Sequence, residues 1–260
     1  MSEPLKIERR GDALWVMIDR PERRNALNDE VFAGLHQALR RSEADGHVRA
    51  VVITGVGDQA FCSGAELDPT RSAFAQGLAE PRHPGGDAFR ALLMHPKPVI
   101  ARVNGACMAG GVGLLAAADI AVAASHARFG LPEVKVGVFP MMVAALLIHR
   151  VGLADRDLCE LSLLGEPVGA DRALRMGLVT RVVEPEQLDA EVDGLVATIA
   201  SRSPTAMRMG KHALDQMRGM SGEAALAYAE TQIRLLGLTE DAREGILAFS
   251  EKRTANWTGR

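Results

Sequence analysis

The chain has 260 residues, of which 47% are hydrophobic and 4% aromatic, and its formal net charge at pH 7 is −3. This length is enough to bury one large core. The weak net charge and the scarcity of aromatic residues exclude a strongly basic or base-stacking surface, so we expect no nucleic-acid partner.

The first half of the chain predicts strands separated by turns and helices. Apolar runs bounded by turn residues predict buried strands at residues 14–18, 50–54, 98–103, 120–124 and 127–129. A helix is expected behind Asn28, a favourable N-cap residue, and Gly46 ends it. The segment Phe61–Leu67 is predicted to be a strand that passes into a turn at Gly64. Residues 68–96 are rich in proline and glycine, which favours a loop around a short helix.

The second half is mostly helical. We expect one further strand at 178–183 and helices at 141–150, 154–164, 170–176, 186–201, 204–218, 221–236 and 240–254. Alternating strands and helices followed by a helical tail predict an α/β fold. We assign residues 1–185 to the core and 186–260 to a carboxyl-terminal helical region. Three successive units of strand, strand-turn and helix suggest degenerate turns of a spiral.

The cysteines and the amino terminus bear on compartment and cofactors. Cys62, Cys107 and Cys159 are widely spaced in apolar surroundings, which indicates neither a disulfide framework nor a zinc knuckle. The seven histidines lack the spacing of metal ligands, so we predict no metal. Residues 1–18 lack the apolar core of a signal peptide, and no run reaches the ~18 uninterrupted apolar residues of a membrane span. We expect a cytoplasmic protein without membrane association.

Two glycine-rich turns and one carboxylate carry the chemistry that the sequence suggests. Residues 103–113 read VNGACMAGGVG, so a strand would stop and a helix would start near Gly110 with unpaired backbone N–H groups. A similar turn at Ser63–Ala65 follows another strand. Two N–H donors directed at one thioester oxygen would stabilise an enolate, and Glu133 could then move protons. Either turn alone is ambiguous, because glycine-rich turns are often purely structural.

The segments FCSGAEL, KPVIARVNGACMAGGVGL and ADIAVAASHARFGLPEVKVGVFP, in this order, resemble the crotonase superfamily of enoyl-CoA hydratases and isomerases. RPERRNALN, GEPVGADRALRMGLVTRVV and FSEKRTANW match this family too, so the resemblance covers nearly the whole chain. It implies a crotonase-type ββα spiral core with a carboxyl-terminal helical trimerisation region, assembled as a homotrimer or a dimer of trimers. The implied substrate is an acyl-CoA thioester, with no separate cofactor because coenzyme A is part of the substrate.

The resemblance also assigns site residues. The backbone amides of Ala65 and Gly110 would be the oxyanion donors, and Glu133 would be the acid/base. The implied substrate-binding and CoA-binding set is Arg23, Ser63, Ala65, Leu67, Gly110, Phe249 and Lys252. In the family, the last two positions complete the CoA site of a neighbouring subunit.

Three positions depart from the family pattern. Gly113 stands where hydratases of the family have their first glutamate, and Glu66 replaces a common aspartate. Glu66 could be a substitute acid, or it could have a surface or structural role. Met141 and Met142 replace a glycine-rich turn; they could line the acyl pocket beside Gly113, or they could only pack the core.

Several functions remain open on the sequence alone. The nominal activity is enoyl-CoA hydration with Glu133 as acid/base. Because a single base suffices to shift a double bond, an enoyl-CoA isomerase is an alternative, as is a non-catalytic acyl-CoA-binding homologue. A dinucleotide-binding oxidoreductase is a further hypothesis, since Gly111-x-Gly113-x-x-Ala116 loosely matches a Rossmann fingerprint. No acidic residue closes a second strand at the distance which that fingerprint requires.

Overall fold

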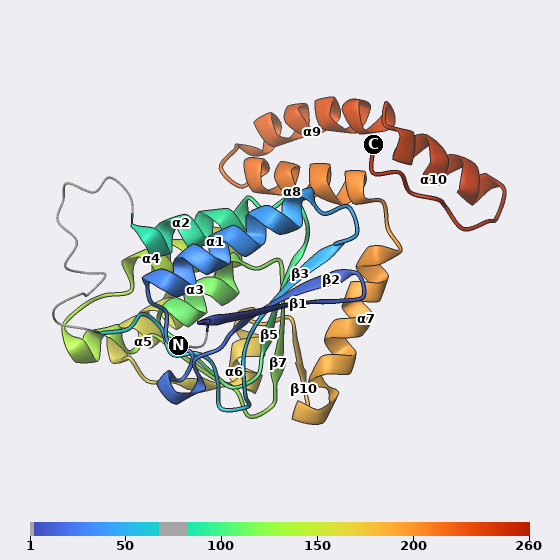
Figure 1. Ribbon diagram of the computed structural model, residues 1–260. Helices are drawn as coiled ribbons and strands as arrows, with labels where there is room; N and C mark the ends of the chain where they lie inside the picture. Colours follow the sequence, from blue (N-terminus) through green and yellow to red (C-terminus); the bar gives the residue numbers. More distant parts are fainter. Residues whose placement is uncertain (1–2, 68–82) are drawn as a thin grey trace.

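Two sheets form the centre of the molecule in the computed structural model, which describes residues 3–67 and 83–260. The larger sheet has the strand order β1-β2-β3-β5-β7-β10 (Figure 1). Its strands are Leu5–Arg10, Ala13–Ile18, Ala50–Gly55, Val99–Val103, Ile120–Ala124 and Arg181–Val183. All neighbouring pairs are parallel except β1 and β2, which form an antiparallel hairpin.

The smaller sheet repeats the connectivity of the larger one. Its order is β4-β6-β8-β9, with strands Ala60–Cys62, Ala106–Met108, Arg128–Gly130 and Val168–Gly169. Each of its first three strands follows a long strand directly, so that β3 leads to β4, β5 to β6 and β7 to β8. Strands β4, β6 and β8 are parallel, whereas β9 is antiparallel to β8. The chain therefore winds as a spiral of strand-strand units.

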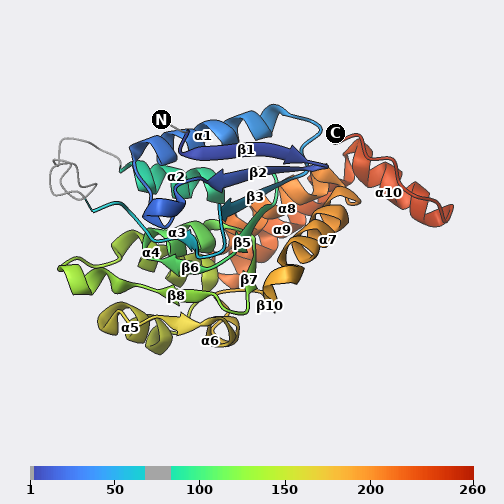
Figure 2. The same cartoon turned by 60° about the horizontal axis from the view of Figure 1, so that its bottom comes forward.

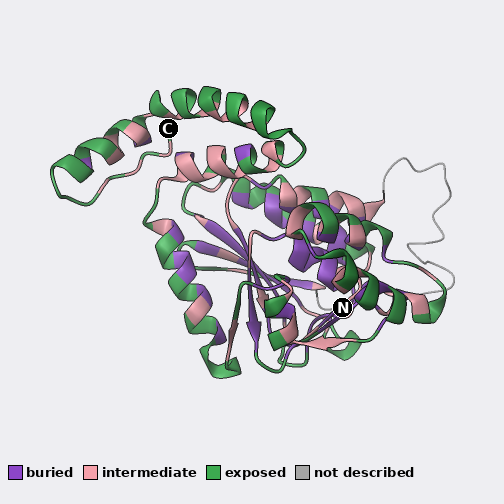
Figure 3. Ribbon diagram, turned by 180° about the vertical axis from the view of Figure 1, so that it is seen from behind, coloured by how far each residue is buried: buried purple, intermediate pink, exposed green. Residues whose placement is uncertain are grey.

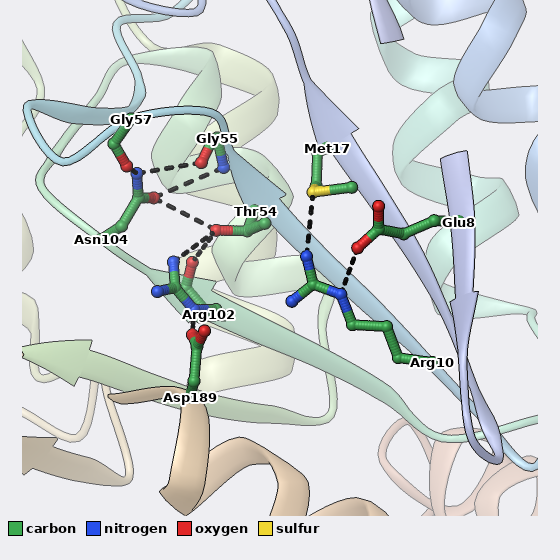
Figure 4. A network of polar contacts seen from close by, with 9 residues as sticks. All are labelled: Glu8, Arg10, Met17, Thr54, Gly55, Gly57, Arg102, Asn104 and Asp189. Atoms are coloured by element: carbon green, nitrogen blue, oxygen red, sulfur yellow. Dashed lines mark hydrogen bonds and ion pairs between the residues drawn. The ribbon is translucent and has the colours of Figure 1, made fainter. Parts of the chain in front are cut away.

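Asn104 joins two corners of this spiral (Figure 4). It is buried between β5 and β6, and its amide nitrogen donates to the carbonyls of Gly55 at 3.0 Å and Gly57 at 2.7 Å. Its side-chain oxygen accepts from the hydroxyl of Thr54 at 3.2 Å. These bonds fix the turn that delivers β4 to the small sheet, because they satisfy buried backbone carbonyls that the turn would otherwise leave unpaired.

Helices cover both faces of the large sheet (Figures 1 and 2). The core helices are α1 (Asp29–Ala44), α2 (Pro84–Leu93), α3 (Gly110–Ala117), α4 (Met141–Leu146), α5 (Asp155–Leu164), α6 (Ala170–Arg175) and α7 (Leu188–Ala200). Short helical turns lie at Pro21–Arg23 (η1), Pro132–Val136 (η2), Leu147–Val151 (η3) and Pro185–Gln187 (η4). Alternate residues of β3 face opposite cores: Val51 and Ile53 pack with α1, α2 and α3, whereas Val52 packs with α7.

The last three helices form an arm whose first helix still lies against the core, while the other two extend beyond it (Figure 1). They are α8 (Pro204–Met217), α9 (Gly222–Gly237) and α10 (Glu240–Ser250). Helix α9 has no buried residue, and this arm is mainly exposed or intermediate in Figure 3. Its exposed large apolar side chains include Leu226, Ile233, Leu235, Ile246, Leu247 and Phe249.

Several elements differ from the sequence-based expectations. Strands β1 and β6 were not predicted; in β1 only Leu5 is buried, because charged residues occupy most of this edge strand. The helix expected at 141–150 is α4 followed by a π-helical turn ending at Val151. The strand expected from Leu178 begins at Arg181. The loop expected at 68–96 contains α2 as predicted, while its residues 68–82 lie outside the described ranges.

Candidate functional site

Three segments with potential chemistry meet at one edge of the small sheet. Strands β4, β6 and β8 are parallel neighbours, and their carboxyl ends lead directly to Ala65, Gly110 and Glu133 respectively. The backbone N–H of Ala109 donates to the carbonyl of Gly130 at 2.9 Å, which ties the second segment to the third. The carboxyl ends of parallel strands are where α/β folds place their ligand sites.

Ala65 and Gly110 lie close together at this edge. A Cβ built on Gly110 would be 3.6 Å from the backbone nitrogen of Ala65, and one built on Gly64 would be 3.3 Å from the nitrogen of Gly110. Leu27 donates to the carbonyl of Gly64 and accepts from the N–H of Glu66, both at 2.8 Å, as in a parallel bridge. In such a bridge the N–H of the intervening Ala65 points away from Leu27.

Gly110 opens a helix through a strained residue. It is the first residue of α3, so its N–H has no partner within the helix. The preceding Ala109 has φ 50° and ψ −122°, a conformation that non-glycine residues rarely adopt. Strain of this kind costs about 1–3 kcal/mol and persists where the surrounding structure enforces it. The backbone amides of Ala65 and Gly110 therefore lie close together at this edge of the small sheet.

Glu133 is a buried carboxyl without a hydrogen-bond partner on one oxygen. It lies on η2, is 9% exposed, and its Oε2 atom has no partner among the described residues. The nearby cation Lys135 is engaged elsewhere, in an ion pair with Glu166 at 2.8 Å. Burial raises the pKa of Glu133 above its ordinary value of 4.5. Burial therefore makes this carboxyl a stronger base than an exposed glutamate, which suits a group that takes up and returns a proton.

No second carboxylate can stand at position 113 without rearrangement. A Cβ on Gly113 would lie 2.8 Å from Cε1 and 3.0 Å from Cε2 of Phe89, and closer still to Cζ. The ring of Phe89, from α2, therefore fills the space that a side chain at this position would enter. Phe89 lies in a segment that suggested only a loop and a short helix, so nothing in the sequence singled it out.

Arg23 and Arg24, which precede α1, contact the glycine-rich turn at Ser63–Ala65. The N–H of Ser63 donates to the carbonyl of Arg24 at 3.1 Å, and the Ser63 hydroxyl donates to the carbonyl of Arg23 at 3.3 Å. The side chain of Arg23 is exposed. Arg23 and Ser63, both expected to bind CoA, therefore lie together, and the positively charged side chain of Arg23 is exposed at the edge of the site.

Glu66 is engaged in a structural contact. Its carboxylate forms an ion pair with Arg20 at 2.9 Å, and Arg20 also donates to the carbonyl of Ala26 at 2.7 Å. This pair links the first turn of the site to the segment that precedes α1. Of the two roles considered for Glu66, the geometry favours the structural one over that of a substitute acid.

The two methionines are surface residues of α4. Met141 is 70% exposed and Met142 is partly exposed, so neither packs the core. A Cβ on Gly86 of α2 would lie 3.6 Å from the sulfur of Met142. Met142 therefore faces α2, whereas Met141 points mainly to solvent. Leu67 is exposed and ends the described part of this loop.

Phe249 and Lys252 lie far from these segments within one chain. Helix α10 packs on α8 and α9, and Figures 1 and 2 both place it at the opposite end of the molecule from α3 and α4. Phe249 is 87% exposed. A single chain therefore does not unite these two residues with Ala65 and Gly110.

One cavity among the described residues lies elsewhere. It measures about 570 Å³ and lies beneath α8, where Asp119 binds Arg150 and accepts from Lys211 at 2.7 Å. The described residues that line it include neither Gly110 nor Glu133. We therefore treat this cavity as separate from the candidate site.

The described residues contain no group of three or more His, Cys, Asp or Glu side chains arranged to hold a metal ion. In the same part of the chain, no helix has the length and apolar character needed to cross a bilayer. Gly111 and Gly113 lie inside α3, where a Cβ on Gly111 would be 2.9 Å from Cβ of Cys62. The close packing of Gly111 on β4 and of Gly113 on Phe89 accounts for the glycines that resembled a dinucleotide fingerprint.

The chain has relatives among known proteins over nearly its whole length. Residues 9–260 match the family model described as enoyl-CoA hydratase/isomerase. The short-chain-enoyl-CoA hydratase of Clostridium acetobutylicum is 33% identical, over 95% of this chain and 94% of that protein. The 1,2-epoxyphenylacetyl-CoA isomerase of Escherichia coli is also 33% identical, over 95% of each chain.

The fold has solved counterparts as well. The crystal structure of an enoyl-CoA hydratase from Mycobacterium smegmatis superimposes with a TM-score of 0.90 at 33% identity, covering 98% of this chain and 99% of that one. The winding of strand-strand units seen here is therefore the expected crotonase-type spiral. The chain belongs to the enoyl-CoA hydratase/isomerase family of the crotonase superfamily.

Proposed function

We propose that this protein moves a double bond within an acyl-CoA thioester, through an enolate, with Glu133 as the acid/base. The observation that carries the proposal is the buried Glu133 carboxyl, one oxygen of which has no partner among the described residues, at the sheet edge where the backbone amides of Ala65 and Gly110 lie close together. The enolate route is available because amide donors directed at a developing oxyanion contribute about 2.7–4 kcal/mol each to transition-state stabilisation.

The proposed reaction needs no water. The thioester oxygen of a 3-enoyl-CoA accepts hydrogen bonds from the N–H groups of Ala65 and Gly110. Glu133 takes a proton from the α-carbon, and the negative charge spreads to the oxygen and to the γ-carbon. The protonated Glu133 then returns a proton to the γ-carbon, which leaves a conjugated 2-enoyl-CoA and restores the carboxylate.

Hydration, the nominal activity of many relatives, fits this site less well. Holding and activating a water molecule between two carboxylates requires a second acidic group near the start of α3. That position is Gly113, its side-chain volume is filled by Phe89, and Glu66 is paired with Arg20. One carboxylate can still move a proton between two carbon atoms.

Binding of the CoA moiety is proposed to use residues at the rim. The exposed Arg23 would meet the phosphates, and the backbone of Ser63 and Ala65 would meet the adenine, with Leu67 beside them. Phe249 and Lys252 would complete the site of a neighbouring subunit. The exposed apolar residues of α9 and α10 support assembly into a trimer or a dimer of trimers, because such surfaces are normally covered.

The test compares wild type with Glu133→Gln on crotonyl-CoA and on a 3-enoyl-CoA. We expect wild type to convert the 3-enoyl-CoA faster than it hydrates crotonyl-CoA, and the variant to lose ~10²- to 10⁴-fold in rate. Glu66→Gln is the matched control, since it removes a carboxylate that is already paired. Equal turnover by wild type and Glu133→Gln would refute the role of Glu133. Tight binding of enoyl-CoA without turnover would instead indicate the non-catalytic homologue.

A further inference from the structure

We propose that Phe89 determines the reaction specificity of this site: its ring takes the place of the side chain missing at Gly113 and keeps water from the start of α3. This inference rests on the proposed function, because it concerns the choice between moving a proton and adding water. It assigns to α2 a wall of the site that the sequence did not reveal.

The position of Gly113 on α3 makes its side-chain space part of the site. Gly110 and Gly113 are three residues apart, so they lie on the same face of the helix about 5–6 Å from each other. The N–H of Gly110 is the proposed donor to the thioester oxygen. A group at position 113 would therefore lie roughly one helical turn from that oxygen, alongside the acyl carbons that follow it.

The ring of Phe89 occupies this space with its tip. The three ring atoms nearest to a Cβ on Gly113 are Cζ, Cε1 and Cε2, and the last two lie at 2.8 Å and 3.0 Å. Real Cβ contacts of this kind are essentially never seen, so even alanine at position 113 would displace the ring. Phe89 is only 5% exposed and packs in the main core cluster, which leaves the ring little room to retreat.

The wall is apolar because a phenyl ring stands where hydratases of the family have a glutamate side chain. A glutamate at position 113 would offer two oxygen atoms to hold and activate water, whereas the phenyl tip offers no hydrogen-bond acceptor. Gly86 lies one turn before Phe89 on α2, and a Cβ there would be 3.6 Å from the sulfur of Met142 and 3.4 Å from a guanidinium nitrogen of Arg90, whose charge pairs with Asp87. We infer that the acyl group packs against an apolar wall formed by Phe89 and Met142, where water is not positioned for attack.

The experiment substitutes Phe89 and Gly113 separately and together. Four proteins are compared with wild type: Phe89→Ala, Gly113→Glu, Phe89→Ala/Gly113→Glu, and the control Phe89→Ala/Gly113→Gln. The control frees the same volume and adds a side chain of the same size, but without a carboxylate. Each protein is assayed for hydration of crotonyl-CoA and for isomerisation of a 3-enoyl-CoA, and its thermal unfolding is recorded without substrate.

We expect Gly113→Glu alone to unfold at a lower temperature than Phe89→Ala/Gly113→Glu, since only the single variant retains the collision. The double variant should gain ~10²- to 10⁴-fold in hydration relative to wild type, the range typical of an added acid/base group. The control pair should show no such gain. This outcome would establish that Phe89 and Gly113 together exclude hydration.

Two outcomes would overturn the inference while leaving the proposed function intact. One is a folded Phe89→Ala/Gly113→Glu protein that keeps Glu133-dependent isomerisation but gains no hydration. The other is an equal gain in the control pair, which would assign the effect to loosened packing. Turnover that does not depend on Glu133 would instead remove the proposed function itself.

Discussion

Replacing Gly64 by alanine tests whether the two turns must touch for the proposed enolate to be stabilised. Gly64 has φ +99°, a conformation that favours glycine. A Cβ at this position would lie 2.5 Å from Cβ of Ala109 and 3.3 Å from the nitrogen of Gly110. Because ordinary carbon contacts lie at about 3.5–4.0 Å, the two turns must separate by about 1 Å to admit the methyl group.

The size of the effect can be worked from this separation. Losing the alignment of one amide donor costs about 2.7–4 kcal/mol, or about 10²- to 10³-fold in kcat. The positive φ costs a further ~1–3 kcal/mol of stability, and overpacking costs about 1–3 kcal/mol. Since each kcal/mol lowers the Tm of a chain near this size by about 2–4 °C, Gly64→Ala should still fold at assay temperature if the wild type is well folded.

Gly57→Ala is the matched control. Gly57 has φ +86°, and a Cβ there would meet no atom within 4 Å. It precedes β4, whereas Gly64 follows that strand, so the control carries similar backbone strain away from the site. Both variants are assayed for kcat on the 3-enoyl-CoA and for Tm. A folded Gly64→Ala protein with kcat within threefold of Gly57→Ala would refute the proposed pairing of the two amides.

Three further predictions concern buried titratable groups. Burial raises the pKa of Glu133 above 4.5, so the wild type becomes less stable as the pH rises from 4.5 through the higher folded pKa. Glu133→Gln should not lose stability in this way, and its Tm near pH 7 in thermal unfolding should be higher than that of the wild type. Burial lowers the pKa of His95, which is 1% exposed, below 6.5, so the free energy of unfolding should decrease as the pH falls from 6.5 to the lower folded pKa, and urea titrations of His95→Gln should not show that decrease. At Asp241 burial acts to raise the pKa, but hydrogen bonds from Ser203, Gly259, Thr258 and Thr205 outweigh it and place the pKa below 3.8. The carboxylate therefore stabilises the fold above pH 3.8, and this stabilisation is lost as the pH falls through the folded pKa. In the same urea titrations, Asp241→Asn should lower the free energy of unfolding by about 1.5–3 kcal/mol near pH 7. An unchanged Tm for Glu133→Gln, a persistent acid decrease for His95→Gln, or wild-type stability for Asp241→Asn would each contradict the corresponding prediction.

The parts of the site that depend on local chemistry could be predicted from the sequence. A strand that ends before two glycines and resumes as a helix predicts unpaired N–H groups, and the structure places Gly110 at the first position of α3. Asn28 was expected to cap α1, and its side chain accepts from the N–H of Val31 at 2.9 Å. Turns and caps are set by a few neighbouring residues, which is why such patterns transfer reliably to the structure.

The parts that depend on tertiary packing could not be predicted in this way. Phe89 is one apolar residue on a short helix, and no periodicity indicates that its ring would meet Gly113, 24 positions later in the sequence. Strand β1 escaped prediction for a different reason. Its alternation is weakened by charged residues and by the partly exposed Ile7, since an edge strand buries little surface.

In the small sheet, the stabilising hydrogen bonds lie at the amino ends of the strands, whereas the strained backbone and the Glu133 carboxyl lie at the carboxyl ends. At the amino ends of β4 and β6, Asn104 satisfies the carbonyls of Gly55 and Gly57, and the corner is closely packed. At the carboxyl ends lie the strained Ala109 and the Oε2 atom of Glu133, which has no hydrogen-bond partner in the described part of the chain. Both features oppose folding, and both persist because the surrounding structure enforces them. The hydrogen bonds of Asn104 at one end of these short strands therefore hold the other end in place. There the backbone amides and the Glu133 carboxyl stay available to a ligand and do not rearrange to bond with one another.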